Sequence, residues 1–195
     1  MVSLDCSNLK IIKANKEILS SIEFDCGDDD LNEFLLDDSF ANIDNSLSKI
    51  YLCLYENNVL GFFSLSADSI KINEKLKINY STYPAIKIGR LAVHKDFQRK
   101  HIGSILIDWI VGFCLELRKD IGVRFISIDA YNQEKIIRFY NKNFFEILKS
   151  EKNKKKYTYV QGFVLEIGLS FKFYFFKSLF CSFQCFDFFF CRGSV

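Results

Sequence analysis

The chain has 195 residues, a formal net charge of +2 and 49% hydrophobic residues. This length and composition predict one globular domain with a sizeable core, and the small net charge leaves no global case for nucleic-acid binding, which would have to rest on local patches. The amino terminus, MVSLDCSNLK, lacks a basic segment followed by an apolar stretch, so the sequence predicts no secretory signal.

The chain has seven cysteines, and their number and spacing indicate the cellular compartment. Those before residue 160 (Cys6, Cys26, Cys53 and Cys114) lie far apart and have no metal-like spacing. Buried, reduced thiols in a cytoplasmic protein are therefore expected, with no metal site.

A helix is expected in the stretch FDCGDDDLNEFLLDDSFANID (24–44). Carboxylates at its start meet the positive end of the helix dipole, and Asp28 or Asp29 can cap the first turn. Its apolar side falls at Leu31, Phe34 and Leu35.

Strands are expected on both sides of that helix. LKIIKAN (9–15) precedes it, and KIYLCLY (49–55) follows it with an alternating pattern that places Ile50, Leu52 and Leu54 on one face. Asn57-Asn58 reads as a hairpin turn, after which the chain returns as VLGFFSLSADSIKI (59–72).

The second half alternates strands and helices. One helix has an especially clear pattern, and we call it the strong helix. It begins after FQRKHIG and carries an apolar stripe with a 3.6-residue period at Ile102, Ile105, Leu106, Trp109, Ile110, Phe113 and Leu117. The other expected elements are the strands 85–93, 123–130, 144–149 and 156–160 and a short helix over 133–143. The order β-α-β-β-β-α-β-α-β-β predicts a mixed sheet with flanking helices, of α/β or α+β class.

Residues after about 160 differ in character. FKFYFFKSLFCSFQCFDFFF (171–190) is half phenylalanine. Ten Phe contribute roughly −3 to −6 kcal/mol to membrane insertion, and Lys177 and Asp187 oppose it by about 2.5 to 3.5 kcal/mol each, so no membrane span is predicted. We expect a domain over residues 1–160 and an appended low-complexity tail over 161–195, in preference to a membrane or partner-binding helix.

A loop with the features of an anion site lies between the strand IKIGRLAV and the strong helix. It comprises Gln98, Arg99, Lys100, His101, Ile102, Gly103 and Ser104. The first turn of a helix offers unpaired N–H groups at the positive end of its dipole, and basic side chains add charge, so the loop is expected to hold phosphate. Gly103 is expected to let the backbone approach the ligand closely.

Two motifs resemble those of the GNAT acetyltransferases. The loop is similar to that family's Q/R-x-x-G-x-G/A motif at Gln98, Ile102 and Gly103, and the preceding Arg90-Leu91-Ala92-Val93 fits as well. Downstream, Asp129-Ala130-Tyr131-Asn132 and the run RFYNKNFFE (138–146) resemble the second half of that family. The resemblance covers about residues 9–160. It implies a mainly antiparallel mixed sheet in which two parallel strands, IGRLAV and RFISIDA, splay apart to hold acetyl-CoA.

The stretches FDCGDDDLNEFL, GFFSLSADSI, IGRLAVHKDFQ and GVRFISIDA resemble one branch of that family, which includes toxins that acetylate the amino group of aminoacyl-tRNA. The resemblance implies an N-acetyltransferase with acetyl-CoA as co-substrate and charged tRNA as the most specific acceptor. If the protein is a toxin, a ribbon-helix-helix antitoxin is an expected partner, and a homodimer is a candidate assembly. A small-molecule or protein amine is the alternative acceptor, favoured by an acceptor mouth lined with carboxylates.

The resemblance also implies roles for individual residues. Tyr140 would protonate the leaving thiolate, and Asn132 would contact CoA. The backbone of Leu91, Ala92 and Val93 would pair with the pantetheine arm, and residues 99–104 would hold the pyrophosphate. No general base is evident, although Asp129 or His94 could act through water.

Two departures from the family pattern motivate a third hypothesis, a catalytically degenerate acetyl-CoA-binding module. His101 and Phe144 stand where the motifs have glycine. Histidine tolerates positive φ better than most residues, whereas Phe144 fits a left-handed cap poorly, so Asn143 is the expected cap residue. The run Lys149–Lys156 suits either a phosphate backbone or, more readily, a solvated hairpin.

Overall fold

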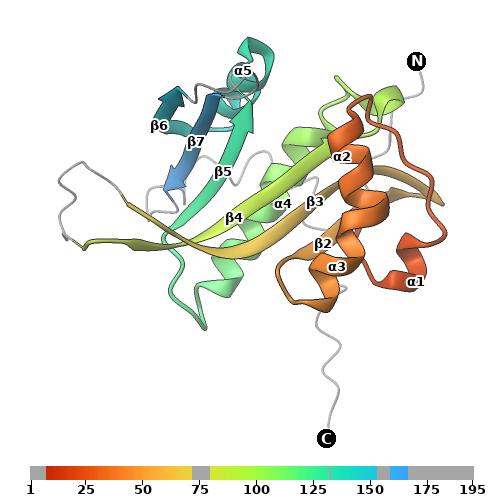
Figure 1. The fold of residues 1–195 in the computed structure, drawn as a ribbon, viewed down its shortest axis with the longest axis horizontal. Coiled ribbons are helices and arrows are strands. Elements are labelled where there is room, and N and C mark those ends of the chain that lie inside the picture. Colours follow the sequence, from red (N-terminus) through yellow and green to blue (C-terminus); the bar gives the residue numbers. More distant parts are fainter. Residues whose placement is uncertain (1–7, 72–79, 132, 153–158, 167–195) are drawn as a thin grey trace, which may run out of the picture.

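The seven strands in the described part of the chain form a single mixed sheet. The computed structural model describes residues 8–71, 80–131, 133–152 and 159–166. Within these ranges the strand order is β1-β2-β3-β4-β5-β7-β6, and only β4 and β5 run parallel to each other (Figure 1). The strands are β1 (Leu9–Lys13), β2 (Lys49–Tyr55), β3 (Asn58–Ile70), β4 (Tyr83–Val93), β5 (Phe125–Tyr131), β6 (Glu146–Lys152) and β7 (Tyr159–Glu166). The mixed sheet predicted from the element order is confirmed, and so is the mainly antiparallel pairing that the family resemblance implied.

Helices cover both faces of the sheet, and a large core lies on each face, beside a smaller third cluster of Ile70, Tyr83, Ala85 and Phe125. On one face lie α1 (Lys16–Leu19), α2 (Asp29–Glu33) and α3 (Ser39–Asp44), and on the other lie α4 (Ile102–Leu117) and α5 (Glu134–Lys142) (Figure 1). The alternation predicted for β2 is confirmed, because Ile50 and Leu52 pack in the α1–α3 core and Cys53 packs in the α4 core. The predicted apolar stripe of α4 also packs entirely against its core.

The region around α2 begins as predicted. The side chain of Asp28 caps α2 by accepting from the Leu31 N–H at 3.3 Å, and Phe34 and Leu35 are buried. Between α2 and α3 the chain forms one π-helical turn, Phe34–Asp38, which the apolar pattern did not indicate. The short helix α1, whose start is capped by Asn15, was not predicted from the sequence.

The β2–β3 hairpin differs from the prediction by one residue. Tyr55 pairs with Asn58, so the turn consists of Glu56 and Asn57, and Asn58 already belongs to β3. Glu56 has φ 54°, a left-handed conformation that short hairpin turns require. The asparagine pair therefore straddles the end of the turn.

The carboxyl-terminal elements bear on the expected domain boundary. β7 runs from Tyr159 to Glu166, so residue 160 falls inside a strand, and residues 167–195 lie outside the described part. β6 and β7 form the expected antiparallel pair, but the basic run between them extends into 153–158, which are also outside it. Cys26, Cys53 and Cys114 are buried thiols, as predicted. Among the described helices, none has the length and apolarity needed to cross a membrane.

Candidate functional site

The two parallel strands separate halfway along their length. The β4–β5 ladder runs from Ala85 opposite Phe125 to Ile88 opposite Ile128 and ends there. Beyond it, β4 stays paired with β3 as far as Val93, and β5 stays paired with β7 as far as Tyr131. The expected splay therefore lies between residues 89–93 and 129–131.

A β-bulge at Gly89 accompanies the splay. The β3–β4 register shifts there, because Ser64 pairs with Arg90 and Leu65 pairs with Ile88, which leaves Gly89 as the extra residue. The buried Ser64 hydroxyl accepts a hydrogen bond from the Arg90 N–H at 2.9 Å. A Cβ on residue 89 would lie 2.9 Å from that hydroxyl oxygen. Bulges bend the strand that carries them, and this one lies where β4 leaves β5.

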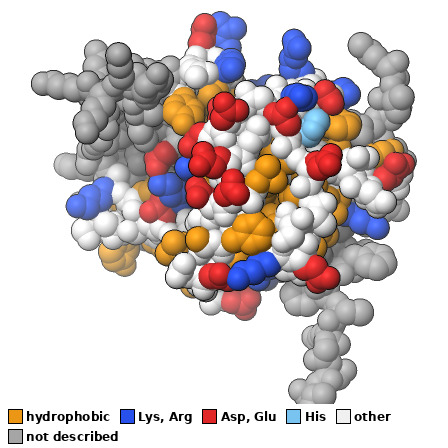
Figure 2. Space-filling model, turned by 45° about the vertical axis from the view of Figure 1, so that its right-hand side comes forward, with side chains coloured by type: hydrophobic (Ala, Val, Ile, Leu, Met, Phe, Trp, Pro, Cys, Tyr) orange, Lys and Arg blue, Asp and Glu red, His pale blue; other side chains and the backbone are white. Residues whose placement is uncertain are grey.

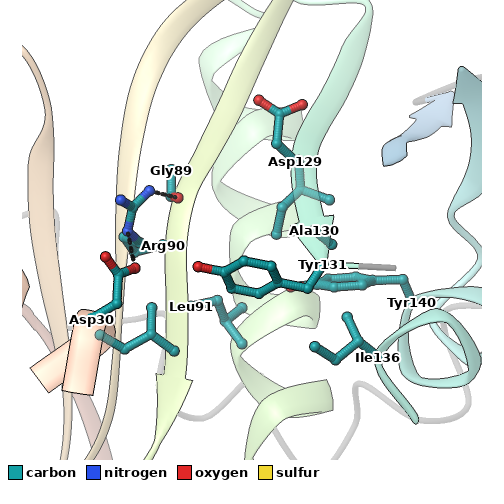
Figure 3. Close-up of a pocket in the computed structure, with 11 residues that line it drawn as sticks. Asp30, Gly89, Arg90, Leu91, Asp129, Ala130, Tyr131, Ile136 and Tyr140 are labelled. Carbon is teal, nitrogen blue, oxygen red and sulfur yellow. Dashed lines mark hydrogen bonds and ion pairs between the residues drawn. The ribbon is translucent and has the colours of Figure 1, made fainter. Parts of the chain in front are cut away.

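A pocket of about 250 Å³ occupies the splay. It is lined from β4, β5, α5 and α2 by Gly89, Arg90, Leu91, Ile128, Asp129, Ala130, Tyr131, Ile136, Tyr140, Asp30 and Leu31. Figure 3 shows the Tyr131 ring extending from β5 toward Arg90 and Leu91 on β4, with the Tyr140 ring behind it. The pocket thus brings the predicted catalytic tyrosine to the splayed strands.

Tyr140 is held in place by the end of its helix. The Phe145 N–H donates to the Tyr140 carbonyl at 3.0 Å and the Phe144 N–H to the Asn141 carbonyl at 3.1 Å, which together form a Schellman motif. The Tyr140 and Phe145 rings also meet edge to face, 5.5 Å apart. Tyr140 is only 6% exposed, and burial raises the pKa of its phenol. The phenol therefore stays protonated at neutral pH.

The left-handed residue of this motif is Phe144, not Asn143. Phe144 has φ 64°, whereas Asn143 has φ −95° and uses its side-chain amide to donate to the Phe139 carbonyl at 2.8 Å. The expectation that Asn143 would take the left-handed conformation was wrong, because the motif fixes the position of that residue relative to the last helical turn. Phe144 thus adopts the left-handed conformation that glycine has at this position of the family motif.

The loop before α4 contains two further left-handed residues. Arg99 has φ 61° and His101 has φ 65°, with Lys100 between them at negative φ. Alternating conformations of this kind turn successive N–H groups toward one concave side, where an anion can bind. Because α4 begins at Ile102, its first-turn N–H groups face the same loop. Arg99, Lys100 and His101 are exposed, so their side chains leave these backbone N–H groups accessible at the expected anion site.

Two loop residues have other roles than those expected from the sequence. The side-chain amide of Gln98 donates to the Cys26 and Val93 carbonyls, so the protein itself uses it. A Cβ on Gly103 would lie 3.0 Å from two ring carbons of Phe139, so this glycine admits a ring of α5 beside α4. Ile102 is buried in the core, which leaves only its backbone for a ligand.

Charged side chains border the pocket, from α2 and from the strands β4 and β5. Arg90 Nε is 3.8 Å from Asp30 Oδ2, and the Arg90 guanidinium lies over the Phe34 ring at 5.1 Å. Asp129 pairs with Lys87. Figure 2 shows acidic side chains spread over the face that carries α2 and α3, with exposed hydrophobic ones between them. The mouth does contain carboxylates, but Asp30 and Asp129 each have a cationic partner.

The two proposed bases differ in position. Asp129 lines the pocket, and His94 does not. The His94 ring packs edge to face against Phe24 and Phe97, and its Nδ1 accepts from the Asp96 N–H at 3.3 Å. His94 therefore caps a short 3₁₀ turn and is removed from the candidates. Asn132 lies outside the described residues.

Sequence reasoning missed Ser64, Gly89 and Asp30. The bulge needs a glycine and a hydroxyl 25 residues apart in the chain, and no local pattern links them. Asp30 was assigned only to the helix amino terminus, and its ion pair with Arg90 depends on how α2 packs on β4.

Comparisons with known proteins agree with this geometry. The family model described as "Acetyltransferase (GNAT) family" matches residues 13–144. A tRNA-acetylating toxin of Mycobacterium tuberculosis (strain ATCC 25618 / H37Rv) is 28% identical over 115 residues, which cover 57% of this chain and 69% of the toxin.

Solved structures share the fold. The crystal structure of AtaTR bound with AcCoA superposes with a TM-score of 0.67 at 22% identity, over 82% of this chain and 94% of that chain. AtaT complexed with acetyl-methionyl-tRNAfMet gives the same TM-score, 0.67, and 22% identity, over 81% of this chain and 94% of that chain. At this level of identity the likeness concerns the fold.

Proposed function

The chain belongs to the GNAT acetyltransferase family, and we propose that it transfers an acetyl group from acetyl-CoA to the amino group of an aminoacyl-tRNA. It is an N-acetyltransferase by family, with acetyl-CoA as its co-substrate. The observation that carries the proposal is the splay of β4 and β5, with Tyr140 lining the pocket there and the loop of residues 99–104 connecting β4 to α4. The relationship to a tRNA-acetylating toxin supports the acceptor.

The residues present fit acetyl-CoA. The ladder between β4 and β5 ends at Ile88, so the β5-facing backbone of Leu91–Val93 is left for the amides of a pantetheine arm. The loop of residues 99–104 would hold the pyrophosphate through its N–H groups, with Arg99 and Lys100 adding positive charge. Leu91 and Val93 direct their side chains into the α4 core, which leaves their backbone as the binding element.

Tyr140 is the proposed general acid. Acetyl-CoA supplies a thioester that an amine attacks directly, so that an N–C bond forms and the C–S bond breaks. The Tyr140 hydroxyl would donate its proton to the departing sulfur and recover one from solvent, while the amine loses a proton to water. Burial raises the pKa of this phenol, so the hydroxyl carries its proton at neutral pH when the thiolate develops. Asp129 is the remaining residue that could assist proton removal through water.

A small-molecule or protein amine is a second acceptor, and one observation favours it. Asp30 and Asp129 both line the pocket, and carboxylates attract ammonium groups. Arg90 and Lys87 offset these charges, so aminoacyl-tRNA remains the leading proposal. Neither His101 nor Phe144 favours a degenerate module, because both keep the left-handed backbone that glycine would provide.

The test uses radiolabelled acetyl-CoA with matched pools of charged and deacylated tRNA. Base-labile label on charged tRNA alone is the expected result, because the ester that joins the amino acid to tRNA hydrolyses in base. Label on small amines or proteins but not on tRNA would show that one of these amines, and not aminoacyl-tRNA, is the acceptor. Acetyl-CoA binding without transfer to any amine would support the degenerate module. If the protein is a toxin, an antitoxin encoded beside it should suppress the labelling.

A further inference from the structure

Two amide side chains join the loop before α4 to the turn before α2. Gln98 Nε2 donates to the Cys26 carbonyl at 2.8 Å and to the Val93 carbonyl at 3.1 Å. Asn32 Oδ1 accepts from the Cys26 N–H at 2.9 Å. Cys26 is thus held from one side by the loop and from the other by α2 itself.

An ion pair strengthens the same junction. Asp25 Oδ2 pairs with Lys95 Nζ at 2.6 Å, and the Lys95 N–H donates to the Asp25 carbonyl at 2.9 Å. Asp25 Oδ1 accepts from Asn32 Nδ2 at 3.1 Å and from the Gly27 N–H at 2.8 Å. The hydrogen bond from Lys95, and then that from Gly27, hold the pKa of Asp25 well below its usual range, so its carboxylate is charged throughout the neutral region.

This junction connects the two sides of the pocket. On one side it adjoins the loop whose N–H groups would hold the pyrophosphate. On the other it fixes the first turn of α2, which brings Asp30 and Leu31 to the pocket wall. Within the described residues, α2 is also tied to β4 by the Asp30–Arg90 pair. A shift of the loop would therefore be transmitted to α2 through Gln98, Cys26 and Asn32.

We propose that Gln98 and Asn32 are positioning residues that couple occupation of the acetyl-CoA loop to the placement of α2 on the acceptor side. Gln98 responds to the loop and Asn32 transmits to α2, so acetyl-CoA binding orders the acceptor wall before the amine arrives. The proposal rests on the proposed transfer for its kinetic consequence, an acceptor KM that depends on this junction. Its structural consequence, the ordering of α2, requires only that acetyl-CoA binds.

The experiment measures hydrogen exchange of the α2 amides, residues 28–33, with and without saturating acetyl-CoA. Saturation is checked by calorimetry on each full-length variant. In the parent protein acetyl-CoA should slow exchange across α2. Gln98→Glu replaces the amide donor with an oxygen facing two carbonyls, and Asn32→Ala removes the other connection, so each should abolish the slowing. If the Gln98→Glu variant no longer binds acetyl-CoA, the Asn32→Ala variant alone tests the coupling, because the Asn32 substitution leaves the loop before α4 unchanged.

Asn42→Ala is the matched control. Asn42 Nδ2 donates to the Asp38 carbonyl at 3.0 Å and its Oδ1 accepts from Ser48, but the residue lies on α3 and does not line the pocket. It should leave the slowing intact. With charged tRNA, Asn32→Ala should raise the acceptor KM about 5-fold or more and leave the acetyl-CoA Kd within about 2-fold.

Two results would overturn the coupling. One is α2 exchange that acetyl-CoA leaves unchanged in the parent protein, and the other is equal slowing in the parent and in Asn32→Ala. Failure of the proposed function appears separately, as a parent protein that slows α2 exchange on binding acetyl-CoA but places no label on charged tRNA.

Discussion

The proposed acetyl-CoA side and the proposed acceptor side of the pocket are built by different means. On the acetyl-CoA side the determinants are backbone conformations: the bulge at Gly89, the left-handed Arg99 and His101, and the Schellman motif that ends α5. On the acceptor side they are side-chain contacts, the Asp30–Arg90 pair and the amides of Asn32 and Gln98.

This difference has a functional meaning. A co-substrate shared by a whole family can be held by backbone groups, whose positions tolerate changes of side chain, as His101 and Phe144 illustrate. An acceptor that differs between relatives needs side chains, which substitution can alter one at a time. Variants on the two sides should therefore change different kinetic constants.

The largest effect is expected at Tyr140, where the two sides meet. Tyr140→Phe should lower kcat about 10²-fold or more, because the thiolate loses its proton donor, while the acetyl-CoA Kd stays within about 2-fold. Steady-state kinetics and calorimetry measure both. Tyr55→Phe, on β2 and outside the pocket lining, should leave both unchanged. Equal kcat in Tyr140→Phe and the parent would remove Tyr140 from the mechanism.

The pH profile sharpens the same point. A proton donor acts below its pKa and fails as pH rises through it. Burial raises the pKa of Tyr140 above the ordinary value of about 10, so this group should cause no fall in kcat below about pH 9. A fall between about pH 7 and 9 that disappears in Tyr140→Phe would contradict this assignment.

Gly103→Ala should disturb Tyr140 through the packing of α5 against α4. The new Cβ would lie 3.0 Å from two carbons of the Phe139 ring, so this ring must give way, and it meets the Tyr140 ring edge to face at 5.0 Å. We expect kcat to fall about 10-fold, since small displacements of a catalytic group have large effects. Gly122→Ala is the control, because a Cβ there meets nothing within 4 Å. Equal kcat in the two variants would show that α5 adjusts freely.

Ser64→Ala tests whether the bulge shapes the splay. The Arg90 N–H loses its partner, so unfolding free energy should fall by about 1–3 kcal/mol and the acetyl-CoA Kd should rise several-fold. Ser39→Ala removes an equally buried hydroxyl, bonded to the Leu35 carbonyl, and should destabilise without changing the Kd. Chemical denaturation and calorimetry compare the two. An unchanged Kd in Ser64→Ala would separate the bulge from acetyl-CoA binding.

The smallest effect is expected at the left-handed residues. Phe144→Gly should stabilise the protein by about 0.5–1 kcal/mol, because relief of left-handed strain exceeds the entropy that glycine loses on folding. His101→Gly should gain less, since histidine accepts this conformation more readily. Thermal unfolding measures both. Destabilisation by Phe144→Gly would show that its side-chain contacts outweigh the strain.

The same division explains how much the sequence could predict. The α4 stripe, the two-faced β2 and the Asp28 cap are local patterns, and the structure confirms them. The splay was predicted from the family resemblance and not from periodicity. It lies between β4 and β5, the two strands expected, where their ladder ends at Ile88 and Ile128.

What sequence reasoning missed depends on contacts between distant residues. Gln98 contacts Cys26 across 72 positions, and Arg90 contacts Ser64 across 26. A one-residue shift separates the expected and observed hairpin turns and also the expected and observed left-handed caps. Turn and cap positions are set by which hydrogen bonds close, and residue preference indicates them only approximately.

A crystal structure of Tyr140→Phe with acetyl-CoA would locate the co-substrate itself, because this variant should bind acetyl-CoA without consuming it. We expect the pantetheine arm along Leu91–Val93, the pyrophosphate on the N–H groups of residues 99–104, and the sulfur facing the ring of residue 140. Acetyl-CoA bound elsewhere, or with its sulfur turned away from that ring, would contradict both the site and the role of Tyr140.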